Sequence, residues 1–239
     1  MNLGNQGQAE LATFDPRFRF PCTITMAGAS QSGKTYRVLS WLRNLDEVFY
    51  NLPPEGYQIW YAHGPYQPCF KEFEDRVRFF QSFDDPLLSR SSLENSSNIF
   101  LIIDDCYSSI DPELLRYLVV ALCHHRGITI ILLVHQIYSS SIRYMRDINL
   151  STTIFCFSYS PQISSMLRTF SQQFFGSSWK KFLEAAEYVL NGAGKDDADV
   201  NNRYNYITVD FSAYKPNKYR ISTYLTNAEG PRCFFVFKD

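Results

Sequence analysis

The chain has 239 residues, of which 45% are hydrophobic, and its formal net charge at pH 7 is −1. This length and apolar content suffice for one large α/β domain or two small ones, and they exclude a chain that is disordered throughout. The near-neutral charge excludes binding of nucleic acid by bulk electrostatic attraction, so such contact would need a local cluster of cations or several subunits together.

Six cysteines are dispersed along the sequence, and no two have the spacing of a zinc site or a redox motif. Five lie in or beside apolar runs, which favours buried thiols in a reducing compartment over a disulfide framework. No apolar stretch is long enough to span a membrane, and the polar residues 1–8 lack the features of a secretion signal. We therefore expect a soluble, intracellular protein.

Residues 1–17 are predicted to be a flexible lead-in, and residues 18–239 a single domain, because no repeat or domain break is visible in them. The apolar run at 22–27 predicts the first strand, and residues 34–42 predict a helix that follows it closely.

Between this strand and helix lies the complete pattern G-x-x-x-x-G-K-[ST] of a phosphate-binding loop. Its members are Gly28, Ala29, Ser30, Gln31, Ser32, Gly33, Lys34 and Thr35. The glycines let the turn wrap backbone N–H groups around phosphate oxygens at a helix N-terminus. We expect Lys34 to reach the β- and γ-phosphates of a nucleotide and Thr35 to place its hydroxyl on Mg²⁺.

Strands and helices then alternate along the chain. A turn at 53–56 leads to a strand at 58–62, and a short helix at 71–76 leads to a strand at 77–80. The polar residues 89–98 predict a loop or a brief helix.

The unbroken apolar run at 99–103 predicts a central parallel strand, since helices cover both faces of such a strand. The strand ends at two aspartates, about seventy residues after the phosphate-binding loop. Asp104 fits a carboxylate that holds the Mg²⁺ bridging the phosphates, and Asp105 fits an acidic group that polarises the attacking water. Two such aspartates can also form a turn or cap a helix, but the spacing and the buried strand that follows favour a nucleotide site.

The next segment predicts a helix and a second buried strand. Asp111 is expected to cap the helix at 111–122, and Pro112 to occupy its first position. Gly127 then ends the turn before the apolar strand at 128–134. This alternation of strands with helices indicates a parallel sheet with helices on both faces.

Polar side chains stand at the end of that second strand. We expect Gln136 at the carboxyl edge of the sheet, where its amide can sense the γ-phosphate by a hydrogen bond. His135 can share this task, but we interpret it as a strand-end side chain. His124 and His125 are interpreted as helix-end groups that interact with the helix dipole.

Phosphoryl transfer also calls for a mobile positive charge that stabilises the transition state, often supplied by a neighbouring subunit. Arg146 and Arg143 follow the sensor strand and are the best-placed candidates, and Arg126 is another. A surface arginine is more often simply solvated, and this alternative stays open for each of the three.

The last third of the chain predicts a strand, two helices, a polar glycine-rich loop and two strands that form a terminal hairpin or edge strands, in that order. They are residues 153–157, 162–175, 179–190, 191–202, 204–211 and 219–225.

The sequence resembles the genome-packaging ATPases of large and mid-sized DNA viruses and virus-like transposons, best known from the poxvirus type. These proteins belong to the FtsK/HerA superfamily of DNA-pumping motors. The similar motifs are residues 28–35, 99–105 and 124–136, followed by the block 146–151 before the next strand, and the similarity extends over about residues 18–225. His135 departs from the family, which more often has threonine or serine before the glutamine.

The resemblance implies a P-loop NTPase fold of the ASCE class, with a mostly parallel central sheet, flanking helices and C-terminal β-strands. It implies Mg²⁺-dependent hydrolysis of ATP, with Lys34, Asp105, Gln136 and Arg146 as catalytic residues. It further implies a pentameric or hexameric ring that threads double-stranded DNA into a preformed capsid in the cytoplasm or nucleus of an infected cell. Capsid or portal-vertex proteins would be its partners. Candidate pore or rim cations are Lys180, Lys181, Lys195 and Arg203, although a solvated helix face or loop explains these residues as well.

Three other functions use a similar core. A DNA helicase or conjugation-type motor uses the same core, and a small-molecule kinase shares the loop but needs a lid with several arginines. A nucleotide-binding assembly factor with little turnover is the third. The presence of both Asp105 and Gln136 beside the loop favours hydrolysis over mere binding.

Overall fold

The computed structural model describes residues 14–106, 109–138, 144–160, 162–191 and 205–237. The strands in this part of the chain are β1 (Phe18–Arg19), β2 (Thr23–Ala27), β3 (Phe49–Tyr50), β4 (Gln58–His63), β5 (Val77–Phe80), β6 (Ile99–Asp104), β7 (Ile128–Val134), β8 (Ile154–Ser158), β9 (Tyr206–Asp210), β10 (Ile221–Thr223) and β11 (Cys233–Phe234). The α-helices are α2 (Lys34–Arg43), α3 (Leu45–Val48), α4 (Arg90–Glu94), α5 (Pro112–Tyr117), α6 (Cys123–Arg126), α7 (Met145–Ser151), α8 (Ile163–Phe175) and α9 (Trp179–Leu190). Shorter helical segments are η1 (Pro68–Phe73), η2 (Pro86–Leu88), η4 (Leu118–Leu122), η5 (Gly176–Ser178), η7 (Asn217–Tyr219) and η8 (Asn227–Glu229).

Nine of the described strands form one sheet in the order β11-β10-β9-β8-β2-β7-β6-β4-β5, and β1 and β3 form a separate parallel pair. The strands from β8 to β5 are parallel. The edge strands β9, β10 and β11 are antiparallel to their neighbours. The prediction of a mostly parallel sheet extended by C-terminal β-strands is therefore confirmed. One strand, β7, separates the strand of the phosphate-binding loop, β2, from the strand that ends in Asp104, β6.

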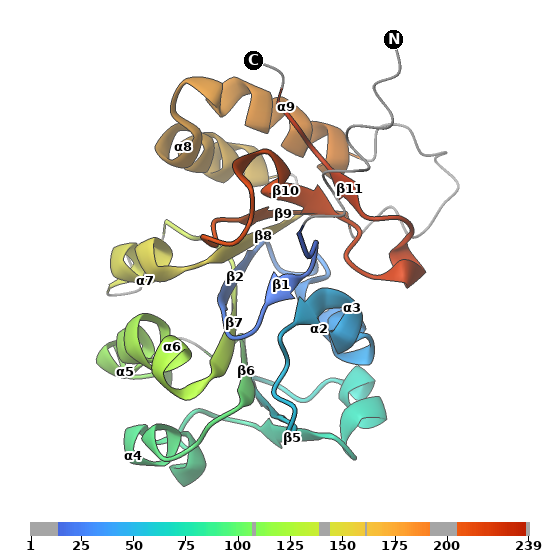
Figure 1. The fold of residues 1–239 in the computed structure, drawn as a ribbon. Coiled ribbons are helices and arrows are strands. Elements are labelled where there is room, and N and C mark those ends of the chain that lie inside the picture. Colours follow the sequence, from blue (N-terminus) through green and yellow to red (C-terminus); the bar gives the residue numbers. More distant parts are fainter. Residues whose placement is uncertain (1–13, 107–108, 139–143, 161, 192–204, 238–239) are drawn as a thin grey trace.

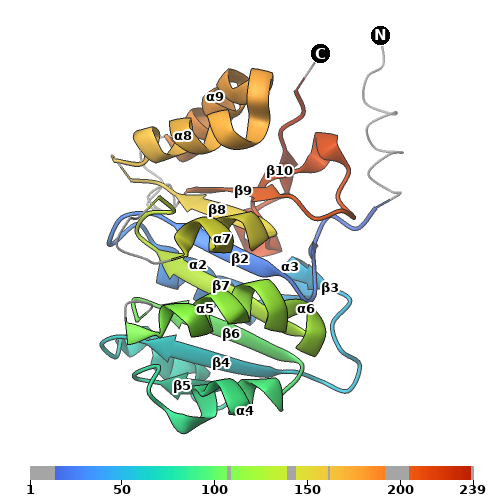
Figure 2. The same ribbon diagram turned by 90° about the vertical axis from the view of Figure 1, so that its left-hand side faces the viewer.

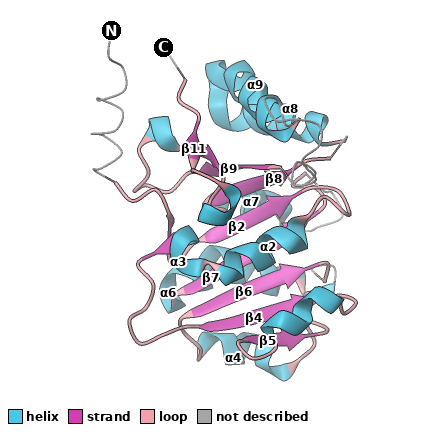
Figure 3. Ribbon diagram, turned by 90° about the vertical axis from the view of Figure 1, so that its right-hand side faces the viewer, coloured by secondary structure: helices cyan, strands magenta, loops and turns pink. Residues whose placement is uncertain are grey.

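Helices cover both faces of the sheet (Figure 1). Helices α4 to α8 lie on one face, which Figure 2 shows from the front, and α2 and α3 lie on the other face, as Figure 3 shows. Successive residues of β6 alternate between two buried cores: Phe100 and Ile102 pack on the α2 side, and Leu101 and Ile103 pack on the opposite side. By this period of two, Asp104 faces the same side as α2.

The helix predicted after the two aspartates begins as expected. The carboxylate of Asp111 accepts a hydrogen bond of 3.1 Å from the backbone N–H of Leu114, and Pro112 occupies the first position. The predicted range ends with the π-helical segment η4, and the helix continues beyond that range through α6. Gly127 ends it with a left-handed backbone at φ 62°, a conformation that glycine adopts without strain.

Several parts of the fold differ from the elements expected from sequence. The polar segment before β8 forms α7, because Met145 and Ile148, three residues apart, are both buried. The helix expected at 71–76 is instead the 3₁₀-helix η1, in which Phe70 and Phe73 are buried at the spacing of one 3₁₀ turn. Strands β1, β3 and β11 were not predicted, because two residues are too few to show the alternation of apolar and polar residues that is typical of a strand.

The described part of the predicted lead-in, residues 14–17, contacts the C-terminal region. The ring of Phe14 stacks on that of Tyr219 with centroids 4.9 Å apart, and the ammonium of Lys215 donates a hydrogen bond of 2.7 Å to the carbonyl oxygen of Pro16. The loop predicted at 191–202 lies outside the described residues apart from its first position. Among the described helices, none combines the length and apolar character that a membrane crossing requires.

Candidate nucleotide-binding site

The phosphate-binding loop connects the carboxyl end of β2 to the first turn of α2. Gly33 precedes α2 with a left-handed backbone at φ 84°, and Gln31 also has a positive φ of 63°. A Cβ atom on Gly28 would lie 2.6 Å from the hydroxyl oxygen of Ser32 and 3.3 Å from the carbonyl oxygen of Ser158, so a side chain there would force its neighbours to shift. Gly33 thus stands where the backbone favours glycine, and the loop leads into the N-terminus of a helix, where free N–H groups bind anions.

Lys34 folds back across the loop that precedes it. Its ammonium donates hydrogen bonds to the carbonyl oxygens of Gly28, at 2.7 Å, and of Ala29, at 3.0 Å. Burial lowers the pKa of Lys34, and the nearby carboxylates of Asp105 and Asp104 oppose this shift. The structure therefore brings Lys34 and both predicted aspartates close enough for their charges to interact.

Asp104 is buried and receives two hydroxyl groups on a single oxygen. The hydroxyls of Thr35 and Tyr61 each donate a hydrogen bond of 2.7 Å to its Oδ2 atom. The other oxygen, Oδ1, is buried and has no hydrogen-bond partner among the described residues. Burial raises the pKa of Asp104, and the hydrogen bonds from Tyr61 and Thr35 lower it again in part. An unpartnered buried carboxylate oxygen beside a threonine hydroxyl fits a divalent cation, because oxygen atoms are the ligands that Mg²⁺ prefers.

Tyr61 was not among the residues predicted for the site. It lies in the middle of β4, completely buried, and burial raises the pKa of its hydroxyl well above the ordinary value, with Asp104 adding to the rise. The hydroxyl therefore stays protonated and donates. The sequence did offer one indication, a tyrosine inside an apolar strand. The hydroxyl of a buried tyrosine needs a hydrogen-bond partner, but the sequence does not show which residue that partner is.

Asp105 faces a different environment from Asp104. Its backbone is left-handed, with φ 53°, and 47% of its side chain is exposed. The ring of His135 lies near it, with 3.6 Å between Nε2 and the carboxylate oxygen Oδ1. The left-handed turn thus separates the buried carboxylate of Asp104, beside Thr35, from the exposed carboxylate of Asp105 at the mouth of the site. This separation suits the two different roles expected for them, metal binding and activation of water.

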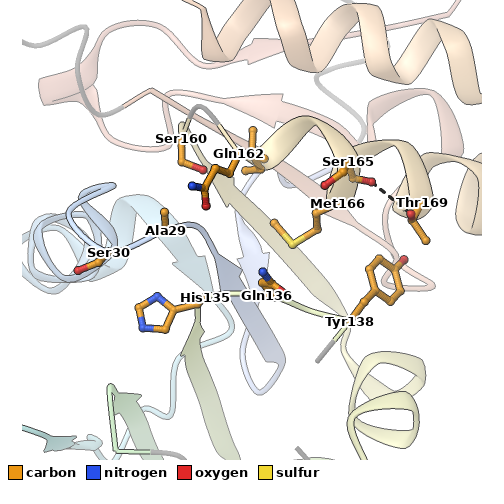
Figure 4. A pocket seen from close by; sticks show the side chains of 11 residues that line it. Ala29, Ser30, His135, Gln136, Tyr138, Ser160, Gln162, Ser165, Met166 and Thr169 are labelled. Atoms are coloured by element: carbon orange, nitrogen blue, oxygen red, sulfur yellow. Dashed lines mark hydrogen bonds between the residues drawn. The ribbon is translucent and has the colours of Figure 1, made fainter. Parts of the chain in front are cut away.

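Two pockets adjoin the loop and share Ser30. The first, about 590 Å³ in volume, is lined by Ser30, Gln31, Gly33, Lys34, Thr35, Tyr36, Gln67, Asp104 and Asp105. The second, about 360 Å³, lies between the start of the loop, the end of β7 and helix α8 (Figure 4). Gln136 lines this second pocket, and Figure 4 shows its side chain and that of His135 extending to different sides of the strand end. The structure therefore places Gln136 next to the loop but outside the lining of the pocket that holds Lys34 and both aspartates.

Helices α7 and α8 hold the segment that follows Gln136. The backbone N–H of Ile137 donates to the sulfur of Met166 on α8, at 3.5 Å, and its carbonyl oxygen accepts a hydrogen bond of 2.6 Å from the side chain of Asn149 on α7. The hydroxyl of Tyr138 donates to Gln173 on α8, at 2.9 Å. These hydrogen bonds connect the residues that directly follow Gln136, the predicted γ-phosphate sensor, to α8.

Neither Arg126 nor Arg146, the two predicted arginines that the structure describes, lines a pocket at the loop. Arg146 is exposed on α7 and lines neither pocket, while its neighbour Asp147 pairs with Arg116 of α5 at 2.8 Å. Arg126 precedes β7 and so lies at the amino edge of the parallel sheet, opposite the loop. Arg143 lies outside the described residues.

Among the four candidate pore cations, Lys180 and Lys181 are exposed at the start of α9. Lys195 and Arg203 lie outside the described residues.

A glycine-rich loop between β2 and α2, an acidic strand end on β6 and the extra strand β7 between them define the fold of a P-loop NTPase. Among solved structures, the chain is similar to the genome packaging NTPase B204 from Sulfolobus turreted icosahedral virus 2 in complex with ATPγS, with a TM-score of 0.52 and 14% identity over 84% of this chain and 96% of that one. The complex of B204 with AMPPCP gives a TM-score of 0.48 at the same identity and coverage. The Legionella pneumophila ATPase DotB gives 0.41 at 14% identity over 80% of this chain and 57% of that one.

No protein-family model matches the sequence, and no curated protein matches it. At 14% identity the similarity to B204 shows the fold alone, and it agrees with the P-loop NTPase fold predicted from the motifs.

Proposed function

We propose that the chain is an ATP-hydrolysing motor subunit that moves double-stranded DNA into a preformed viral capsid. The observation that supports this most directly is the hydrogen bond between Thr35 of the phosphate-binding loop and Asp104 at the end of β6. This contact assembles a nucleotide and metal site in a fold that is also found in a genome packaging NTPase. The order of the sequence motifs supports the packaging role.

The residues divide the work of hydrolysis among them. The N–H groups of the loop and the ammonium of Lys34 bind the phosphates, and Lys34 exchanges its two loop carbonyls for phosphate oxygens. Thr35 and Asp104 would hold Mg²⁺, which neutralises part of the phosphate charge when it is bound. Asp105, exposed at the mouth of the site, orients the attacking water and accepts its proton. Gln136 detects the γ-phosphate from the adjoining pocket.

A ring of subunits completes the site and supplies the grip on DNA. Arg146 is exposed and lines neither pocket of its own chain, so we propose that it reaches the nucleotide of a neighbouring subunit. A chain of net charge −1 can hold a polyanion when a few lysines and arginines of each subunit line one channel. Capsid or portal-vertex proteins are the proposed docking partners, in an infected cell or in the virion.

The proposal is tested by measuring ATP hydrolysis with and without double-stranded DNA while the mass of the assembly is determined. We expect a pentamer or hexamer whose turnover rises when duplex DNA is added. Absence of hydrolysis in every assembly state would contradict the motor function. Separation of the strands during hydrolysis would instead favour a helicase.

A further inference from the structure

Tyr61 and Asp104 lie on neighbouring strands and on the same face of the sheet. In the register of β4 and β6, Tyr61 is opposite Ile102, and His63 is opposite Asp104. Because side chains alternate with a period of two, Tyr61, Ile102 and Asp104 all face α2. The tyrosine side chain is long enough to reach from its own position to the carboxylate two residues further along β6, where its hydroxyl donates at 2.7 Å.

Two donors from different elements fix the rotation of the Asp104 carboxylate. Thr35 approaches Oδ2 from the first turn of α2, and Tyr61 approaches the same oxygen from β4. Rotation of the carboxylate would break both hydrogen bonds at once. The oxygen left over, Oδ1, is buried without a hydrogen-bond partner among the described residues.

The ring of Tyr61 is held by its neighbours. Its centroid lies 5.1 Å from that of Phe70 and 5.6 Å from that of Phe79, so the hydroxyl cannot swing away without disturbing this aromatic cluster. Thr35, in contrast, must serve two partners. Since its hydrogen is donated to Oδ2, the lone pairs of its oxygen remain for a cation.

We propose that Tyr61 is a positioning residue for the divalent cation of the nucleotide site. It holds Oδ2 of Asp104, so that Oδ1 is presented to the cation or to a water molecule bound to it. Tyr61 sets the affinity for the metal without touching the metal itself. This inference rests on the proposed function, because it assumes that the site binds a nucleotide together with Mg²⁺.

The test is equilibrium binding of a fluorescent, non-hydrolysable ATP analogue to the full chain, starting in EDTA and titrating with Mg²⁺. In Tyr61→Phe, the Mg²⁺ concentration for half-maximal enhancement of binding is expected to rise about tenfold, as is typical when a group that orients a metal ligand is removed. The affinity for the analogue in EDTA is expected to remain unchanged. In an Asp104→Asn background, Tyr61→Phe should have no further effect on the response to Mg²⁺.

The matched control is Tyr206→Phe, which removes another buried tyrosine hydroxyl, one that donates to Glu229. It should leave the response to Mg²⁺ unchanged. Thermal unfolding in EDTA verifies that each variant is folded, and Tyr61→Met is a second variant without the hydroxyl, for which we expect the same loss.

An unchanged Mg²⁺ response in Tyr61→Phe, or an equal loss of analogue binding in EDTA, would overturn the positioning role and leave the proposed function intact. Failure of the wild-type chain to bind the analogue with Mg²⁺ would instead refute the proposed function, and this inference with it.

Discussion

The hydroxyl of Thr35 donates a hydrogen bond of 2.7 Å to Oδ2 of Asp104, although 69 positions separate the two residues. The contact exists because β2 and β6 are parallel strands on either side of β7, so that their carboxyl ends meet at one edge of the sheet. The hydroxyl and the carboxylate of the candidate nucleotide site therefore meet at this edge of the sheet.

Replacement of Lys34 by alanine is expected to lower the affinity for ATP by about 10- to 100-fold, because hydrogen bonds to a charged group contribute about 1.5–3 kcal/mol. Hydrolysis should fall below detection. Binding of a fluorescent ATP analogue measures the affinity, and Lys180→Ala, at an exposed lysine on α9, is the control. Wild-type affinity in Lys34→Ala would exclude the lysine from phosphate binding.

Asp105→Asn is expected to retain ATP binding and to slow hydrolysis by about 10²- to 10⁴-fold, the usual contribution of a general base. The amide keeps the size of the side chain but cannot accept the proton of the attacking water. Single-turnover hydrolysis measures the chemical step separately from binding. A normal rate in this variant would remove Asp105 from the mechanism.

For Arg146→Ala we expect a loss of about 10³-fold or more in the turnover of the assembled ring, with unchanged affinity of the single subunit for ATP. The arginine lines neither pocket of its own chain, so its effect must depend on assembly. Mixing inactive Arg146→Ala subunits with Lys34→Ala subunits should restore part of the activity, because each supplies what the other lacks. Arg168→Ala, at an exposed site on α8, serves as control. A collapse of ATP affinity in the isolated Arg146→Ala subunit would refute the action in trans.

The buried ion pair between Arg37 of α2 and Glu229 of η8 connects the C-terminal segment to the helix that follows the phosphate-binding loop. Glu229 also accepts hydrogen bonds from the hydroxyl of Tyr206, at 2.6 Å, and from the backbone of Leu225, at 2.8 Å. Glu229→Ala is expected to lower the free energy of unfolding by about 3–5 kcal/mol, since it leaves a buried guanidinium without its counterion.

Chemical denaturation measures this change. The control is Glu72→Ala at the exposed pair with Arg43, which should change the free energy of unfolding little because water screens both charges. Equal effects of the two substitutions would contradict the argument from burial.

The cysteines should divide into two reactive and four protected thiols. Cys69 is exposed and Cys233 is partly exposed, whereas the other four are buried. Burial raises the pKa of Cys106, Cys123 and Cys156 to about 12. Because the thiolate forms only as the pH rises past the pKa, about one in ten thousand of these groups is ionised at pH 8. A thiol reagent at pH 8 should label two cysteines rapidly in the folded protein and all six in denaturant; rapid labelling of a third would contradict the burial.

Several features of the fold were predictable because local chemistry specifies them. Asp111 and Pro112 start a helix where a cap and a first-turn proline are expected, and Gly127 ends it. The apolar runs that became β6 and β7 are buried along their whole length, as central parallel strands should be. Helix α7 was missed because its seven residues contain only two apolar positions that reach the core, too few to establish a period.

The candidate site was predictable only in part. The loop, Lys34, Thr35 and Asp104 are brought together as the motifs suggested. The role of Tyr61 was not visible in sequence, since its hydroxyl meets Asp104 only through the register of β4 and β6. The pocket of Gln136 depends on α8, which follows it by about thirty residues and packs against the end of β7.

The sequence by itself determined most of the longer strands and helices and the place of the phosphate-binding loop between β2 and α2, because these depend on hydrophobic period, capping and glycine conformation over a few neighbouring residues. Only the tertiary structure decided that β7 lies between β2 and β6, that the hydroxyls of Thr35 and Tyr61 meet one oxygen of Asp104, and that Oδ1 has no hydrogen-bond partner within the part of the chain that the structure describes. Strand order and register arise from packing between segments that are distant in the chain, and no local pattern encodes them.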